Sequence, residues 1–394
     1  MNDFVVSPEK LLYGGDALAR RDDGKAVFVP YAVPGDKLLV RTTAEKKNYI
    51  RAEILEILAP GGGRVSPLCL YFGQCGGCHW QHVEYSLQVE AKRGILEEIF
   101  HHRFPETRQL TITMRLCSQP FGYRSRARLR RRVGREPIVG FFRAGSGIIE
   151  DIVYCPLFRP SLNDALSTLR KVPSGRHEKN WNAKDEEIVI LCSDEENIWA
   201  TSENSGKETT LRRKVGDFIY NVSALTFFQA NDFIIYELVL YVLSCVSQNI
   251  CSALDLFSGV GLFSLPLAFR VNTVTAVENS RESHRLCVMN AAGAAIDNLK
   301  TICADVVEWL NLQVASSFDC VVLDPPRAGI GSEIMEHVCR VASKTIIYVS
   351  CDPQTLARDL ERIDMDQWRI VSITGFDMFP QTYHFETVVH LLRK

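Results

Sequence analysis

The sequence predicts an α/β protein of three domains. Short alternating apolar runs cover residues 4–58, closely spaced cysteines open a mixed α+β segment after residue 61, and buried-strand and helix-length segments alternate after Asp217. We therefore expect a small barrel, a central domain and a doubly wound C-terminal domain, at residues 1–60, 61–216 and 217–394. A chain of 394 residues is long enough to give each domain a core.

The composition is that of an ordinary globular protein, but its charge is unevenly distributed. The 45 Lys+Arg and 47 Asp+Glu give a formal net charge of −2. Residues 101–150 hold 11 basic and 3 acidic side chains, a local +8, so the rest of the chain sums to −10. A nucleic-acid partner therefore remains possible for a protein that is not basic overall.

The sequence predicts neither a secretion signal nor a membrane-spanning segment. The start MNDFVV lacks a basic stretch followed by an apolar one, and the longest apolar run, 233–246, is interrupted by Glu237. That run is shorter than the roughly 20 residues a bilayer span needs. We expect a cytoplasmic monomer without a membrane partner. In a reducing cytoplasm the 13 cysteines should be free thiols, and those with a function should be metal ligands or nucleophiles.

The first two domains are expected from turn and strand signals. Glycine-rich turns separate apolar runs of strand length and predict a small β-barrel, which ends at the Pro/Gly cluster 59–63. The central domain should hold a helix over 84–100 and strands from Tyr123 onward. Its strip at 185–210, rich in Glu, Ser, Asn and Thr, indicates exposed turns.

The C-terminal domain alternates strands and helices. Strands are predicted at 252–257, 273–278, 300–303, 319–324 and 345–350, with closing strands at 369–376 and 385–392. Parallel sheets of this kind bind ligands at the carboxyl ends of their strands.

A glycine-rich loop follows the first of these strands. It reads Asp255-Leu-Phe-Ser-Gly259-Val-Gly261, and Glu278 ends the next strand, where a carboxylate can bind ribose hydroxyls. Ser264 stands where a dinucleotide site has its third glycine, which favours a mononucleoside cofactor such as S-adenosylmethionine over NAD. The later strand-end motif Asp324-Pro-Pro would stiffen the loop beside this site.

Cys351 and Glu386 form a candidate catalytic pair. Cys351 lies between a strand and a helix, whose dipole favours the thiolate although Asp352 opposes it, and Glu386 begins the last strand. Carbon 5 of uracil is a poor nucleophile until a thiolate adds at carbon 6. The resulting enolate can take a methyl group, and a base then removes the carbon 5 proton. One cysteine and one carboxylate suffice for this chemistry.

Together these motifs resemble the RNA uracil-5-methyltransferase family, in order and over nearly the whole chain. The matching stretches are Phe227-Phe-Gln229-Ala-Asn231, the glycine loop, Asp324-Pro-Pro-Arg327, Ser350-Cys351-Asp-Pro-x-Thr-Leu-Ala-Arg358-Asp and Phe379-Pro-x-Thr-x-His384-x-Glu386. The resemblance implies a Rossmann-like class I methyltransferase sheet, with Cys351 as nucleophile and Glu386 as base. It places further residues at cofactor or target-base positions: Gln229, Phe257, Gly259, Gly261, Glu278, Asp305 and Asp324. Leu262 departs from the family, whose members often carry a polar residue there.

Three cysteines lie close together in Cys69-x5-Cys75-Gly-Gly-Cys78, a spacing that suits zinc or an iron-sulfur cluster. One branch of the family carries a [4Fe-4S] cluster on this pattern, and the resemblance then makes Cys155 the fourth ligand, with Cys117 as the competitor. Full cysteine ligation predicts a structural or RNA-contacting role rather than radical chemistry.

Two features predict RNA contacts. Arginines stand at every second position, which on a strand makes one face basic, at Arg124, Arg126, Arg128, Arg130 and Arg132. Residues 4–58 resemble the TRAM domain, with Gly14-Gly15 and Val33-Pro-Gly-Asp36 as matching stretches, and the resemblance implies an oligonucleotide-binding-type β-barrel. The target uridine must leave its stack to reach Cys351.

The sequence therefore predicts formation of 5-methyluridine in structured RNA. The cluster-bearing branch favours 23S rRNA, and transfer RNA is the alternative. An RNA cytosine-5-methyltransferase would typically carry a second cysteine, and an amino-group methyltransferase an aromatic residue, where this chain has Arg327. A non-catalytic iron-sulfur RNA-binding protein is the alternative from another class.

Overall fold

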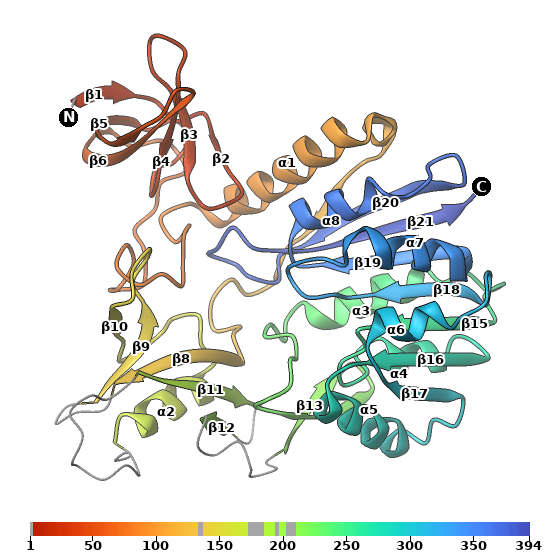
Figure 1. Cartoon of the computed structure of the whole chain (residues 1–394). Coiled ribbons are helices and arrows are strands. Elements are labelled where there is room, and N and C mark those ends of the chain that lie inside the picture. Colours follow the sequence, from red (N-terminus) through yellow and green to blue (C-terminus); the bar gives the residue numbers. More distant parts are fainter. Residues whose placement is uncertain (1–2, 133–136, 172–184, 194–196, 202–209) are drawn as a thin grey trace.

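The computed structural model describes residues 3–132, 137–171, 185–193, 197–201 and 210–394. A barrel, a small mixed region and a large α/β region follow one another along the chain (Figure 1). None of the helices in these ranges is both long and apolar enough to cross a membrane.

The N-terminal barrel is confirmed as a six-stranded sheet, ordered β1-β5-β6-β4-β3-β2. Its strands are β1 (Asp3–Val6), β2 (Lys10–Leu11), β3 (Ala17–Arg20), β4 (Ala26–Val29), β5 (Lys37–Glu45) and β6 (Tyr49–Ala59). Alternate side chains such as Val27 and Val29 are fully buried. Asp36, also buried, accepts hydrogen bonds from the amides of Val33 at 2.7 Å and Gly61 at 2.8 Å. The Val33-Pro-Gly-Asp36 stretch thus fastens the end of the barrel.

The central region forms a five-stranded sheet, ordered β10-β9-β8-β11-β12. Its elements are β8 (Arg126–Arg132), β9 (Ile138–Phe142), β10 (Ile149–Asp151), α2 (Pro160–Leu169), β11 (Glu186–Cys192) and β12 (Asn197–Thr201). The prediction of exposed turns over 185–210 is wrong where the structure describes this strip. The run 188–192 is apolar and buried, so it pairs as a central strand, while polar residues flank it. Residues 194–196 and 202–209 of the strip lie outside the described ranges.

The C-terminal sheet has eight strands, ordered β17-β16-β15-β18-β19-β21-β20-β7. One of these strands, β7 (Thr113–Arg115), comes from an earlier part of the chain. The other seven are β15 (Ser252–Leu256), β16 (Thr273–Glu278), β17 (Leu299–Cys303), β18 (Phe318–Leu323), β19 (Ala342–Ser350), β20 (Trp368–Phe376) and β21 (Glu386–Arg393). The hairpin β13 (Thr210–Val215) and β14 (Phe218–Ser223) precedes them, and the helices are α3 (Ile235–Ser244), α4 (Ser264–Ala268), α5 (Arg281–Gly293), α6 (Val306–Asn311), α7 (Gly331–Val341) and α8 (Pro353–Leu360). Strands β15 to β19 pair in parallel, and β21 is antiparallel to both neighbours. The predicted doubly wound sheet is therefore confirmed.

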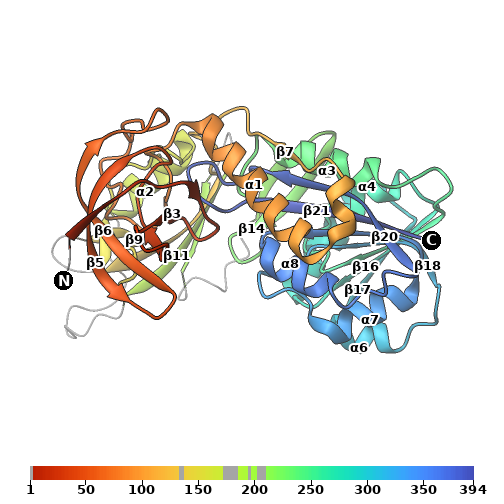
Figure 2. The ribbon, with the colours of Figure 1, turned by 90° about the horizontal axis from the view of Figure 1, so that it is seen from above.

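Two elements from the predicted central domain pack on this sheet. β7 (Thr113–Arg115) pairs in parallel with β20, and α1 (Tyr85–Arg103) packs against α8 and β20, with η1 (Pro105–Gln109) between them in the chain. Figure 2 shows α1 running from the barrel across the C-terminal layer. One apolar cluster accordingly continues from the barrel through α1 into the sheet. The domain boundaries at residues 60 and 216 remain predictions. α1 and β7 precede residue 216 in the sequence but pack on the C-terminal sheet, which follows it.

Candidate functional site

The carboxyl edge of the C-terminal sheet brings Cys351 and Glu386 together. β19 ends at Ser350 and β21 begins at Glu386, and the antiparallel register pairs Ser350 with Thr387. Cys351 therefore stands opposite Glu386. Asp324, which follows β18, lies on the same edge, because β18 and β19 are parallel neighbours.

The segment around Cys351 is fastened on both sides. Asp352 caps α8 through Oδ1, which accepts from the amides of Gln354 at 2.9 Å and Thr355 at 3.0 Å. Its other oxygen accepts a hydrogen bond of 3.0 Å from the hydroxyl of Tyr13, a residue of the barrel. The nucleophile loop is thus held by its own helix and by the N-terminal domain.

Burial controls the protonation of Cys351. It raises the pKa of the thiol to about 12, and the nearby charges of Glu386 and Asp324 act in the same direction, while Arg327 opposes them. Desolvation and the two carboxylates therefore act against the thiolate, which the dipole of α8 was expected to favour.

Glu386 is a buried carboxyl with a shifted pKa. Its side chain is only 1% exposed, and this burial raises its pKa to about 7, against the lowering effects of a hydrogen bond with Gln229 and the charge of Arg327. Burial together with Glu386 raises the pKa of Asp324. A carboxyl that titrates near neutral pH is suited to proton transfer.

The glycine-rich loop is shaped for close approach of a ligand. Phe257 and Gly259 have φ of 60° and 56°, and Gly261 has φ of 95°. Glu278 binds the loop directly, because its Oε2 accepts from the Gly259 amide at 2.9 Å. Ser264, at the missing third glycine, donates a hydrogen bond to buried Asp255, which explains a polar residue at that position.

The remaining cofactor candidates differ in how far they are engaged. Asp305 caps α6, its Oδ1 accepting from the Val307 amide at 2.9 Å and the Glu308 amide at 3.2 Å. Gln229 is 2% exposed, and its Oε1 has no hydrogen-bond partner among the described residues. Leu262 is buried in apolar surroundings and offers only its carbonyl, which accepts from Tyr220 at 3.1 Å.

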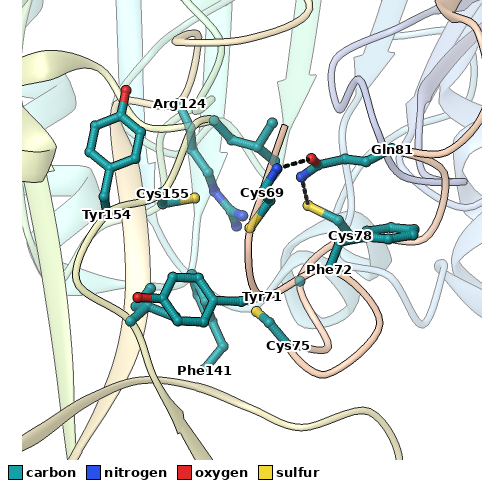
Figure 3. A pocket seen from close by; sticks show the side chains of 13 residues that line it. Cys69, Tyr71, Phe72, Cys75, Cys78, Gln81, Arg124, Phe141, Tyr154 and Cys155 are labelled. Carbon is teal, nitrogen blue, oxygen red and sulfur yellow. Dashed lines mark hydrogen bonds between the residues drawn. The ribbon is translucent and has the colours of Figure 1, made fainter. Parts of the chain in front are cut away.

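A second site gathers the predicted cluster cysteines (Figure 3). One pocket is lined by four cysteines together with aromatic side chains: Cys69, Cys75, Cys78, Cys155, Tyr71, Phe72, Phe141 and Tyr154. The four side chains point toward a common centre, and Arg124 reaches in among them. Burial raises the pKa of Cys78 to about 12 and of Cys155 to about 11.

The residues that line the pocket favour Cys155 over Cys117 as the fourth member. Gln81 links two of the thiol-bearing residues, accepting from the Cys69 amide and donating to the Cys78 sulfur, each at 3.2 Å. Cys117 does not line the pocket, and its sulfur lies 3.2 Å from the Gln119 carbonyl oxygen. In the ranges given above, no three His, Cys, Asp or Glu side chains form a group that could hold a metal ion.

The predicted basic strip divides into two parts. Arg126 is directed inward, donating to the carbonyls of Thr226 at 2.7 Å and Ala224 at 3.2 Å, and Arg124 lies in the cysteine pocket. The other three remain accessible and face acidic residues of β11 and the residue before it, in the pairs Arg128–Glu187, Arg130–Glu187 and Arg132–Asp185. The structure therefore does not place all five arginines on one free face.

Tyr13 and Gln381 contribute to the site and were not singled out from the sequence. Their contacts join parts of the chain separated by about three hundred residues, as in Tyr13 to Asp352 and Gln88 to Gln381. No local pattern signals such pairs, although Gln381 lies within a stretch that matched the family.

The fold and the carboxyl-edge site define a class I methyltransferase domain preceded by a small N-terminal β-barrel. Residues 186–394 match the family model described as tRNA (Uracil-5-)-methyltransferase, and residues 6–55 match the TRAM domain. The chain belongs to this RNA uracil-5-methyltransferase family and is an enzyme of that class.

Individual relatives agree over almost the full length. The chain is 32% identical to a 23S rRNA (uracil(1939)-C(5))-methyltransferase RlmD of Enterobacter sp. (strain 638), over 95% of this chain and 93% of that protein. It is 29% identical to an uncharacterized RNA methyltransferase of Thermotoga maritima, over 98% of each. The fold matches the Pyrococcus abyssi tRNA (uracil-54, C5)-methyltransferase, solved with S-adenosyl-L-homocysteine, with a TM-score of 0.77 and 24% identity over 98% of this chain and 99% of that one.

Proposed function

We propose that this protein methylates carbon 5 of a uridine in structured RNA, with S-adenosylmethionine as methyl donor. The observation that carries the proposal is the strand register that sets Cys351 opposite Glu386 at the carboxyl edge. Family membership supports the donor, as does the S-adenosyl-L-homocysteine bound in the Pyrococcus abyssi enzyme.

The two residues have separate roles. The Cys351 sulfur, after losing its proton, adds to carbon 6 of the uracil and leaves an enolate whose carbon 5 is nucleophilic. When bound, S-adenosylmethionine supplies the methyl group that carbon 5 takes up. Glu386 then removes the carbon 5 proton, and the electron pair of that bond re-forms the double bond as the Cys351 sulfur leaves. Burial with a pKa of about 7 lets Glu386 take up this proton.

The donor would lie over the glycine-rich loop. Glu278 offers a carboxylate already fixed to the Gly259 amide, Phe257 lies in the same loop, and the absence of a side chain at Gly261 keeps the loop tight. Asp305 follows β17 and Asp324 follows β18, at the same edge of the sheet as Glu278. We assign Gln229 to the target base, because its unpaired Oε1 and its hydrogen bond with Glu386 lie at the catalytic carboxyl.

We propose that Cys69, Cys75, Cys78 and Cys155 hold a [4Fe-4S] cluster. The four thiols line one aromatic pocket but are not yet grouped closely enough to hold a metal ion, so binding of a cluster would have to draw them together and release their protons. Zinc is the alternative. Metal analysis of protein purified without oxygen decides between them: iron and sulfide, both lost in C75S, support the cluster, whereas zinc would contradict it.

The substrate is proposed to be 23S rRNA. Relatives named as 23S rRNA (uracil(1939)-C(5))-methyltransferases match nearly the whole chain, and the cysteine pocket agrees with the cluster-bearing branch of the family. Transfer RNA is the second candidate, because the solved neighbour is a tRNA enzyme. We propose that the TRAM barrel and Arg128, Arg130 and Arg132 contact the RNA backbone, since their side chains are accessible.

Incubation with uridine-containing transcripts and labelled donor tests the function. We expect 5-methyluridine in digests of 23S rRNA fragments, and none with C351A. 5-Methylcytidine as product, or full activity of C351A, would contradict the proposal. C339A, which removes a thiol outside both sites, is the matched control and should remain active.

A further inference from the structure

Residues 377–385 form the loop between β20 and β21 and lead directly into Glu386. Three consecutive carbonyls of this loop accept hydrogen bonds from the first third of the chain. Lys92 donates to Phe379 at 3.2 Å, Tyr123 donates to Pro380 at 3.0 Å, and the His79 and Trp80 amides both donate to Gln381 at 3.0 Å. The loop is therefore held mainly from outside the C-terminal sheet.

Gln381 is the most constrained residue of the loop. Its side chain is 2% exposed, and its φ of 69° is a left-handed value that a residue with a Cβ adopts only when its surroundings hold it there. It also forms a reciprocal amide pair with Gln88 of α1. The Gln381 amide donates to Gln88 Oε1 at 2.9 Å, and Gln88 Nε2 donates to Gln381 Oε1 at 3.0 Å.

We propose that Gln381 is a positioning residue that fixes the loop so that Glu386 faces carbon 5 of the target base. This inference rests on the proposed function, in which Glu386 is the base. Cys351 is fastened by hydrogen bonds that Gln381 does not make, through Asp352, α8 and Tyr13, although the Tyr13 ring also packs against Tyr383 of the loop. Loosening the loop should therefore impair proton removal while leaving thiol addition and methyl transfer in place.

The substitution Q381M tests this separation, because methionine has a similar length and cannot accept the hydrogen bond from Gln88 Nε2, while the backbone amide at position 381 can still donate to Gln88 Oε1. On uridine RNA we expect turnover to fall roughly tenfold to a hundredfold and a covalent enzyme–RNA species to accumulate, as it should in E386Q. On 5-fluorouridine RNA no proton is available at carbon 5, so Q381M should form the trapped adduct at a rate within about twofold of the unsubstituted enzyme.

Two further variants complete the experiment. Q88M removes both hydrogen bonds with Gln381, together with those that Gln88 Nε2 donates to the Trp80 and Val83 carbonyls. It should show the same separation of turnover from adduct formation as Q381M, so it carries the test if Q381M does not fold. Q367M changes an exposed glutamine at the opposite end of β20 and should behave as the unsubstituted enzyme.

The outcomes separate the inference from the proposed function. Unchanged turnover in both Q381M and Q88M, or adduct formation and turnover reduced by the same factor, would overturn the positioning role alone. Failure of the unsubstituted enzyme to form any 5-fluorouridine adduct would overturn the mechanism, and this inference with it.

Discussion

At the scale of single residues, charge and burial around Cys351 and Glu386 decide how the site works. The sequence motifs identified both residues, but not their protonation, because pKa values depend on neighbours brought together by the fold. Arg327 is an exposed cation that lowers the pKa of both the Cys351 thiol and the Glu386 carboxyl. The position where rival enzyme classes carry a cysteine or an aromatic residue therefore supplies a charge that favours both ionised forms.

Replacing this cation should move the pH dependence of methylation. Glu386 acts as a base only when deprotonated, so the rate should rise with pH through about 7. In R327M both pKa values increase, and the rising limb should shift to higher pH by roughly 0.5 of a pH unit, where a full pKa unit corresponds to about 1.36 kcal/mol. Rates at saturating RNA across pH 5–9, the range about this pKa, provide the measurement. R369M, at an exposed position near the start of β20, is the control. A shift toward lower pH in R327M would contradict the assignment.

At the scale of elements, local patterns located most strands of the C-terminal sheet within a few residues of their observed bounds, as in β16 (Thr273–Glu278). They missed β11 because its apolar run of five residues lies in a polar strip. They also missed that α1 and β7 pack on the C-terminal sheet, since that contact is between distant segments. A fully buried ion pair joins α1 to the loop after β20, where Lys92 of α1 donates to Asp377 at 2.6 Å.

Removing one member of this pair should destabilise the protein strongly. K92M leaves the Asp377 carboxyl buried without its partner charge, which costs about 3–5 kcal/mol of unfolding free energy. Urea denaturation followed by tryptophan fluorescence measures the loss. K10M, which breaks the exposed ion pair between Lys10 of β2 and Glu98 of α1, should cost less than about 1 kcal/mol. Equal effects of the two substitutions would refute the role of burial.

At the scale of the whole molecule, three parts of the chain meet at one loop. The barrel, the cysteine pocket and the carboxyl-edge site all lie close to the loop 377–385, through Tyr13, His79 and Gln381. The domain order was predictable from composition and motifs. The contacts that these three parts make with the loop 377–385 were not predictable, because they are hydrogen bonds and ring contacts between residues far apart in sequence.

With a net charge of −2, RNA binding requires local cations, and β8 presents two exposed ones in Arg128 and Arg132. R128Q/R132Q should weaken binding to all RNA sequences alike and reduce the salt dependence of log affinity by about 1.4–1.8, two phosphate contacts' worth. Binding titrations at several salt concentrations measure this slope. R362Q/R369Q, which removes two exposed arginines of the C-terminal half, is the control, and an identical slope in both double variants would exclude β8 from the RNA interface.

The central claim is that Cys351 adds covalently to the target uridine, and one measurement tests it directly. Target RNA containing 5-fluorouridine is incubated with enzyme and S-adenosylmethionine, digested, and the peptide that carries the nucleotide is identified by mass spectrometry. We expect a methylated 5-fluorouridine attached to Cys351, absent in C351A. An adduct on another residue, or none with RNA that the enzyme methylates in its uridine form, would contradict the claim.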